Sequence, residues 1–312
     1  MRFFTRILFV SFVLWGLAGQ AQVVKSINDE NLKIPMPAKP SSASSQARPS
    51  ATITSSVTID TATVYFRLID SAQTHIQKKD WSNAAIFIRK AIVAEPSNPN
   101  NSLLLSNLAT LQRYQGKLSD AIKNYTLAID MTPNAVALLN NRAALYLQVD
   151  SLRLAIADYK RVVALDPADE EARYNLGMIG VEQRDFKLAE QYFIDITRYH
   201  PNSSLAIKGQ AFLNKEQGNY AKAAQCFSKV IEVEPTPSLL ANRADCYLMM
   251  KKLAEAADDI NNAIAINPDD GYLYLLRAKL KKLRYENEEV KKDVQLAVKH
   301  GIDPAVAKGM LE

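Results

Sequence analysis

The side chains of this chain that could do chemistry are few and lie far apart. The chain has three histidines, His75, His200 and His300, which are separated from one another by at least 100 residues. A metal site usually needs several such ligands at short spacing, and none of the usual spacings occurs. The sequence also lacks a phosphate-binding loop, a nucleophile elbow and a dinucleotide fingerprint. We therefore expect solvent-exposed histidines, no enzyme activity, no metal site and no cofactor.

The elements that position these residues repeat along the chain. Six prolines follow one another at intervals of 37, 34, 34, 34 and 33 residues: Pro96, Pro133, Pro167, Pro201, Pro235 and Pro268. A period near 34 residues is typical of stacked helical hairpins, in which each unit buries its apolar face on its neighbours. The period therefore favours a repeat array over a single globular core.

Small and bulky side chains recur in register with these prolines. The residue 24 positions before each proline is alanine or glycine: Ala72, Ala109, Ala143, Gly177, Ala211 and Ala244. The residue 12 positions before is always alanine: Ala84, Ala121, Ala155, Ala189, Ala223 and Ala256. The residue 8 positions before is bulky and apolar: Ile88, Tyr125, Tyr159, Phe193, Phe227 and Ile260. Helices that cross closely need small side chains at the crossing and large ones beside it, and proline ends a helix because it lacks a backbone N–H.

This pattern resembles the tetratricopeptide repeat family, in which each unit is a helix-turn-helix of about 34 residues closed by a proline. The resemblance implies an all-α fold, a right-handed α-solenoid of about seven repeats within residues 59–304. The predicted repeats span residues 65–98, 102–135, 136–169, 170–203, 204–236, 237–270 and 271–304, followed by a tail at 305–312. The seventh is a degraded copy with Ile302 in the proline position.

Two irregularities refine this expectation. Gly116 and Gly218 fall where the turns between the two helices of a repeat are expected. The interval of 37 residues comes from an insertion at residues 98–101. We expect this insertion to loosen the connection between the first and second repeats.

Residues 1–21 have the pattern of a secretory signal peptide. Arg2 and Arg6 precede an apolar run from Ile7 to Leu17, and small residues favour cleavage after Ala21. An uncleaved membrane anchor is the alternative, but the run is short against the roughly 20 residues that span a bilayer. Residues 22–58, rich in proline and serine, predict a flexible linker. The chain is therefore expected outside the cytoplasm of a bacterium, in the periplasm or secreted.

The charge of the chain argues against a nucleic-acid partner. The formal charge is +5, and loss of Arg2 and Arg6 with the signal peptide lowers it to +3. Nucleic-acid binders usually concentrate basic residues on one face, whereas here lysines and glutamates are interspersed. Nothing in the sequence implies a small-molecule substrate, and it leaves the oligomeric state open.

The resemblance also implies where a partner would bind. In this family the first helix of each repeat lines a concave groove through its second, fifth, ninth, twelfth and thirteenth positions. We count from Ser102, Val136, Glu170, Ser204 and Pro237 as first positions. The groove residues are then Arg113, Tyr114, Asn140, Glu171, Tyr174, Met178, Lys208, Phe212, Lys215 and Met249. Aromatic, methionine and long cationic side chains suit a peptide or protein surface, although Met178 and Phe212 could equally pack against neighbouring helices.

A carboxylate clamp of the kind found in some members of the family is not expected. The runs Asn141–Ala143 and Asn242–Ala244 resemble part of that clamp, but only Lys208 supplies one of the other cations that it needs. A charge clamp requires several cations around one carboxylate. We therefore interpret both Asn-Arg-Ala runs as features of helix packing.

The two cysteines leave two possibilities open. Cys226 falls on the second helix of the fifth repeat and Cys246 on the first helix of the sixth, and these helices are expected to be neighbours. A location outside the cytoplasm permits a disulfide, but free cysteine is also a common buried residue.

Taken as a whole, the residues predict a non-catalytic scaffold that binds a protein or peptide in the groove. The alternative is a structural or self-assembling component of a cell-envelope complex, because the weak seventh repeat and short tail leave an end that is poorly capped.

Overall fold

The computed structural model describes residues 61–309, and every regular element in that range is helical. The predicted signal peptide, its cleavage after Ala21, the linker at 22–58 and the last three residues lie outside the described part. The described chain belongs to two compact units, residues 61–165 and residues 166–309.

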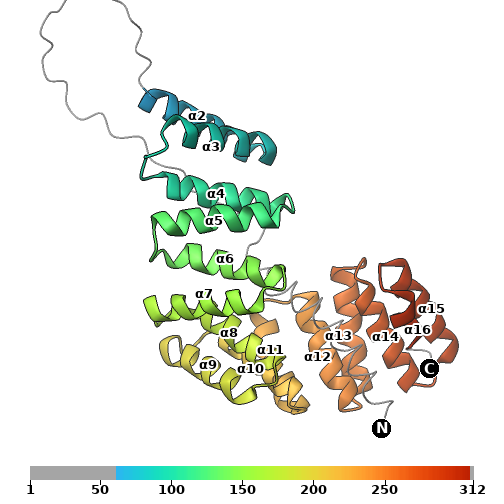
Figure 1. The fold of residues 1–312 in the computed structure, drawn as a ribbon. Coiled ribbons are helices and arrows are strands. Elements are labelled where there is room, and N and C mark those ends of the chain that lie inside the picture. The colour runs from blue at the N-terminus through green and yellow to red at the C-terminus, as the bar shows by residue number, and fades with distance from the viewer. Residues whose placement is uncertain (1–60, 310–312) are drawn as a thin grey trace, which may run out of the picture. The chain divides into compact units, whose positions relative to one another are not determined.

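The first unit consists of three helical hairpins that follow one another in chain order (Figure 1). Its helices are α2 (Thr61–Gln77), α3 (Trp81–Ala94), α4 (Asn101–Tyr114), α5 (Leu118–Met131), α6 (Val136–Gln148) and α7 (Leu152–Leu165). Each first helix packs mainly on the second helix of its own hairpin, and each second helix then contacts the next hairpin within the unit.

The second unit continues the same pattern with four hairpins and a short terminal helix (Figure 1). Its helices are α8 (Glu170–Glu182), α9 (Phe186–Tyr199), α10 (Ser204–Glu216), α11 (Tyr220–Val233), α12 (Pro237–Met249), α13 (Leu253–Ile266), α14 (Gly271–Leu283), α15 (Asn287–Lys299) and α16 (Pro304–Lys308). The prediction of an all-α fold built from helix-turn-helix repeats is therefore confirmed. Residues 305–308 of the predicted tail, together with Pro304 from the end of the predicted seventh repeat, form α16.

The recurring side chains form the core of each repeat. All six alanines that lie 12 residues before a proline are fully buried, and the bulky residues four positions later are at most 1% exposed. The helices α5, α7, α9, α11 and α13 each end two residues before their proline. The small residues thus allow the two helices to approach, and the bulky ones fill the space beside the crossing.

Three repeats also hold their two helices together with a buried ion pair. Each joins an arginine of the first helix to an aspartate 16 residues later on the second helix: Arg142 to Asp158 at 2.7 Å, Arg243 to Asp259 at 2.6 Å, and Arg277 to Asp293 at 2.7 Å. The hydroxyls of Thr126 and Ser228, on the preceding repeat, accept further hydrogen bonds from Arg142 and Arg243. The arginines of both Asn-Arg-Ala runs therefore serve helix packing, as the sequence indicates.

The turn inside every repeat requires one residue with a left-handed backbone. Gly116 and Gly218 occupy this position with φ of 72° and 80°. Five other repeats place a larger residue there: Lys79, Asp150, Arg184, Lys251 and Tyr285, with φ between 56° and 63°. A side chain in this conformation costs roughly 1 kcal/mol relative to glycine.

Side chains of the insertion at residues 98–101 are hydrogen-bonded to the end of the first repeat; that the insertion loosens the connection to the second repeat stays a prediction. Asn101 is 1% exposed, and its Nδ2 donates to the carbonyl oxygens of Glu95 at 2.7 Å and Pro96 at 3.1 Å. The Nδ2 of Asn98 donates to the Glu95 carboxylate at 2.7 Å. These amide side chains satisfy acceptors of Glu95 and Pro96, at the end of the first repeat, and so attach the insertion to it.

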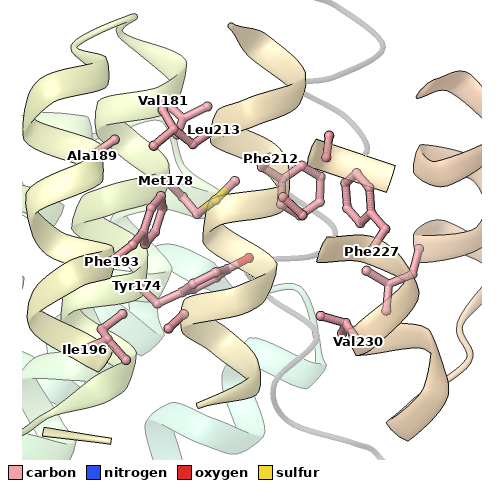
Figure 2. Packing of buried hydrophobic residues seen from close by; sticks show 14 of the residues in the cluster. Tyr174, Met178, Val181, Ala189, Phe193, Ile196, Phe212, Leu213, Phe227 and Val230 are labelled. Atoms are coloured by element: carbon pink, nitrogen blue, oxygen red, sulfur yellow. The ribbon is translucent and has the colours of Figure 1, made fainter. Parts of the chain in front are cut away.

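Glycine is required twice around one aromatic ring in the second unit. The Phe193 side chain is 1% exposed and lies in the apolar cluster that Figure 2 shows. A Cβ atom on Gly177 of α8 or on Gly209 of α10 would overlap this ring. The two glycines therefore let α8 and α10 close around Phe193.

Replacing Gly209 with alanine is expected to destabilise the second unit by about 1–2 kcal/mol, because overpacking outweighs the usual helical preference for alanine. Chemical denaturation followed by circular dichroism measures the change. Phe193→Leu removes the ring that the alanine side chain would overlap. Gly209→Ala should therefore destabilise the Phe193→Leu variant less than it destabilises the original chain. A Gly209→Ala variant as stable as the original chain would contradict this account.

Candidate binding surface on the first helices

The first helices of the second unit form one side of it, which we call the first-helix face (α8, α10, α12 and α14). Helix α8 contacts α10, and α12 contacts α14, in addition to the contacts inside each repeat. Direct contact between the first helices of successive repeats is expected on the inner side of a curved stack. This face is therefore where the sequence places the groove.

A chain of three charged side chains crosses the first-helix face. The Lys215 ammonium of α10 lies 3.0 Å from the Asp245 carboxylate of α12, and Lys279 of α14 lies 2.7 Å from the same carboxylate. The Lys215 Nζ also donates to Oδ1 of Asn242 at 2.9 Å. The chain joins three successive repeats and carries one more positive than negative charge.

Burial and neighbouring charges shift the pKa values of Asp245, Lys215 and Tyr272. Burial alone raises the pKa of the Asp245 carboxyl, but Lys215 and Lys279 outweigh it and hold that pKa well below its usual range. Burial lowers the pKa of Lys215, and Asp245 reverses this, so that the pKa lies above its ordinary value. Burial and then the Asp245 carboxylate raise the pKa of the Tyr272 hydroxyl to about 12. The Asp245 carboxylate and the Lys215 ammonium therefore stay charged at neutral pH.

Lys208 differs from Lys215 and Lys279 because it has no carboxylate beside it. Its Nζ lies 5.9 Å from the centre of the Tyr174 ring, and within residues 61–309 it makes no hydrogen bond or ion pair. Burial lowers the pKa of Lys208, while the more distant Glu234 acts in the opposite direction. A partly desolvated cation above an aromatic ring is available to an anionic or carbonyl group of a ligand.

Several predicted groove residues are buried in the packed core. Tyr174, Met178 and Phe212 are 6%, 7% and 3% exposed, and Figure 2 shows their side chains among those of Phe193 and Phe227. Of the two possibilities left open for Met178 and Phe212, packing against neighbouring helices is the one that occurs. The cause is the aromatic cluster, in which the Phe212 and Phe227 rings meet edge to face at 5.3 Å.

The other predicted groove residues are divided between the two units. In the first unit Asn140 is buried and Arg113 is half-buried, and the half-buried Tyr114 stacks on Trp81 with ring centres 6.1 Å apart. In the second unit Glu171 is half-buried and Met249 is 48% exposed. Sequence reasoning missed Asp245 and Lys279, although both occupy the ninth position of their repeats, as Phe212 does. Their role depends on contacts between repeats, which one repeat considered alone does not reveal.

The histidines are not freely solvated, so that expectation is wrong. All three are half-buried and have polar neighbours: His75 with Asp80 at 2.9 Å, His200 with the Ala168 carbonyl at 2.7 Å and His300 with Asp269 at 3.5 Å. Each therefore supports the structure near a helix end. Within residues 61–309 no group of histidine, cysteine and acidic side chains is arranged to hold a metal ion.

The two cysteines are not joined. Cys246 is buried and Cys226 is half-buried against the same apolar cluster, and burial raises the pKa of the Cys246 thiol to about 12.

Among the described helices, none combines the length and the apolar character needed to cross a membrane.

Comparison with known proteins identifies the repeat type. The sequence profile of the tetratricopeptide repeat matches residues 145–203 and 210–271. A crystal structure of a tetratricopeptide repeat protein from Parabacteroides merdae ATCC 43184 is 34% identical, with a TM-score of 0.69 over 80% of this chain and 98% of its own. No curated protein sequence matches the chain.

Two more distant structures share the fold. PilW, a widely conserved type IV pilus biogenesis factor, is 21% identical, with a TM-score of 0.55 over 66% of this chain and 94% of its own. The Cut9–Hcn1 hetero-tetramer of the APC/C is 13% identical, with a TM-score of 0.62 over 78% of this chain and 54% of the matched one. At these identities the likeness shows the fold alone.

The repeats, their packing and the similar structure from Parabacteroides merdae agree with one another. Proteins built from such repeats generally act as non-catalytic scaffolds for protein–protein interaction, which implies protein partners in general terms. The chain belongs to the tetratricopeptide repeat family.

Proposed function

We propose that this protein is a non-catalytic scaffold that binds an extended segment of a protein partner on the first-helix face of residues 166–309. The observation that carries the proposal is Lys208, a partly buried cation with no ion-pair partner in the described chain. Desolvating a charge without pairing it costs stability. Such a cost is common where a side chain is retained for binding.

Replacing Lys208 with methionine is expected to stabilise the protein by about 1 kcal/mol, because an apolar side chain of similar length replaces a partly desolvated cation. The same variant should bind its partner at least about tenfold more weakly. Thermal unfolding measures the first effect. Partner capture by crosslinking in the native cell envelope, followed by titration with the purified partner, measures the second.

Lys222→Met provides the matched control, since Lys222 lies exposed on α11. It should change neither the stability nor the binding. If Lys208→Met lowers the stability, or if it leaves the affinity unchanged, the first-helix face is not the binding site.

The location outside the cytoplasm is part of this proposal. It is supported by the signal-peptide pattern of residues 1–21. Mass spectrometry of the mature protein should find Gln22 at its N-terminus. An intact N-terminus in the membrane fraction would favour the uncleaved anchor.

Self-assembly is the weaker candidate because the C-terminal end of the repeats is covered. Helix α16 packs on α15, Ala307 is fully buried, and Ile302 and Val306 join the same apolar cluster. The end therefore offers little apolar surface to a second copy. Sedimentation at several concentrations tests this, and a concentration-dependent increase in mass would restore the candidate.

A further inference from the structure

We propose that the second unit has another docking surface, at the turns that follow α12 and α14, for an acidic segment of a protein partner. We call it the paired-turn surface; it comprises Met249, Lys251 and Lys252 from one turn and Lys282, Leu283, Arg284 and Tyr285 from the other. The Nη2 of Arg284 donates to the Leu253 carbonyl at 2.9 Å, which joins the two turns. The surface does not depend on binding at the first-helix face.

The paired-turn surface exposes three large apolar side chains. Tyr285 is 89% exposed, Met249 is 48% exposed and Leu283 is 41% exposed. The Lys279 Nζ lies 4.0 Å from the Met249 sulfur, and Lys279 stands one helical turn before Leu283 on α14. Exposed apolar side chains thus lie on both of the turns that Arg284 joins, among exposed cationic side chains, and such a combination is typical of an interaction site.

Tyr285 is also held in a backbone conformation that disfavours its side chain. Its φ is 63°, at the position where Gly116 and Gly218 serve in other repeats. A bulky residue is rarely found with positive φ. The described structure gives the ring little to pack against, since 89% of the residue is exposed. Lys79, Asp150, Arg184 and Lys251 share this backbone conformation in other repeats, so Tyr285 differs from them in its large, exposed ring rather than in its backbone. The turn itself does not need that ring, because glycine serves the same position at Gly116 and Gly218.

The charges of the paired-turn surface indicate the chemistry of the partner. Lys251, Lys252, Lys282 and Arg284 are all exposed. Two carboxylates also lie in or beside these turns: Glu255, which lies 3.8 Å from Lys252, and Glu286, which follows Tyr285 in the sequence. The excess of positive charge complements an acidic segment, whose encounter with the surface it would accelerate. Tyrosine and arginine, adjacent here as Arg284 and Tyr285, are the residue types that most often dominate binding energy at protein interfaces.

Fluorescence anisotropy with two short labelled peptides tests the proposal on the full chain. In the first probe glutamate alternates with leucine and phenylalanine, and in the second glutamine replaces every glutamate. We expect the glutamate peptide to bind at least about tenfold more tightly, and added salt to weaken it because screening reduces the attraction. Equal binding of both peptides, or no binding of either, would overturn the proposal.

Tyr285→Gly separates a functional role of the ring from a structural one. The variant should have a higher melting temperature, because glycine relieves the strained turn. It should nevertheless bind the glutamate peptide at least about tenfold more weakly. Asp150→Gly is the matched control, since Asp150 occupies the same turn position with φ of 57° in the first unit. It should raise the melting temperature without weakening the peptide. Unchanged affinity in Tyr285→Gly would exclude the ring from binding.

Three further arms distinguish the alternatives. Lys251→Glu should lower the affinity for the glutamate peptide, and Lys208→Met should leave that affinity unchanged. These two variants distinguish a failure of this proposal from a failure of the proposed binding at the first-helix face. Vesicles of phosphatidylglycerol and phosphatidylcholine in equal parts, and single-stranded DNA, serve as competitors. If either binds more tightly than the glutamate peptide, the partner is an anionic membrane surface or a nucleic acid, and the proposal is wrong.

Discussion

Replacing Asp259 with alanine is expected to lower the free energy of unfolding by about 3 kcal/mol, because the change leaves a largely buried arginine without its counterion. The side chains of Asp259 and Arg243 are 5% and 20% exposed, and their ion pair measures 2.6 Å. The Nε of Arg243 makes a second bond to the same carboxylate at 2.8 Å. Urea denaturation followed by circular dichroism measures the loss.

The fourth repeat supplies the matched control for this prediction. It has Leu176 and Tyr192 at the two positions that Arg243 and Asp259 occupy in the sixth repeat. Transplanting that pair, as Arg243→Leu with Asp259→Tyr, removes both charges together. The double variant should therefore lose much less stability than Asp259→Ala. If the double variant is less stable than Asp259→Ala, the ion pair itself stabilises the fold by more than an unpaired arginine destabilises it.

Replacing Asp245 with asparagine is expected to cost about 3 kcal/mol at neutral pH. The Lys215 side chain is 11% exposed, so it cannot regain full hydration when its carboxylate is lost. The more exposed Lys279 can turn toward solvent, so Lys215 carries most of the loss. Asp120→Asn is the control, since the Asp120–Lys123 pair is exposed and 3.9 Å long, and its loss should not be measurable.

The same substitution has a defined pH dependence. The pKa of Asp245 in the folded chain lies well below the ordinary value of about 3.9. Its ionised form therefore contributes stability above about pH 5, and this contribution is lost as the pH falls through about 4 and below. The difference in stability between the original chain and Asp245→Asn should narrow over that range. A constant difference down to acid pH would contradict the assigned charges.

The repeat architecture could be predicted because it depends on residues close in sequence. The alanine at 223, the ring at 227 and the proline at 235 lie on or just after one helix, so their spacing shows which face is buried and where the helix ends. The Arg-Asp pairs were only partly predictable. The arginine of each Asn-Arg-Ala run was recognised as a packing residue, but its aspartate stands 16 residues away on another helix.

The details of the binding surfaces were harder to predict because exposure depends on side chains of other helices, both in the same repeat and in neighbouring repeats. Phe212 occupies a groove position by count, yet the Phe227 ring packs against it. Asp245 occupies the corresponding position and becomes the centre of a charged chain only because Lys215 and Lys279 reach it from both sides. Asn101 reads as part of a loop insertion, but its amide satisfies two backbone carbonyls.

The amino-acid sequence by itself determined the helical repeat, the small residues at each crossing and the absence of a recognisable catalytic motif. These features follow from the periodicity of single helices and from short-range steric limits. The tertiary structure decided which groove residues are buried, which charges are paired, that Lys208 has no ion-pair partner among the described residues, and that Tyr285 is 89% exposed. Burial and ion pairing are set by side chains of different helices, in one repeat or in successive repeats, that meet only in the folded chain.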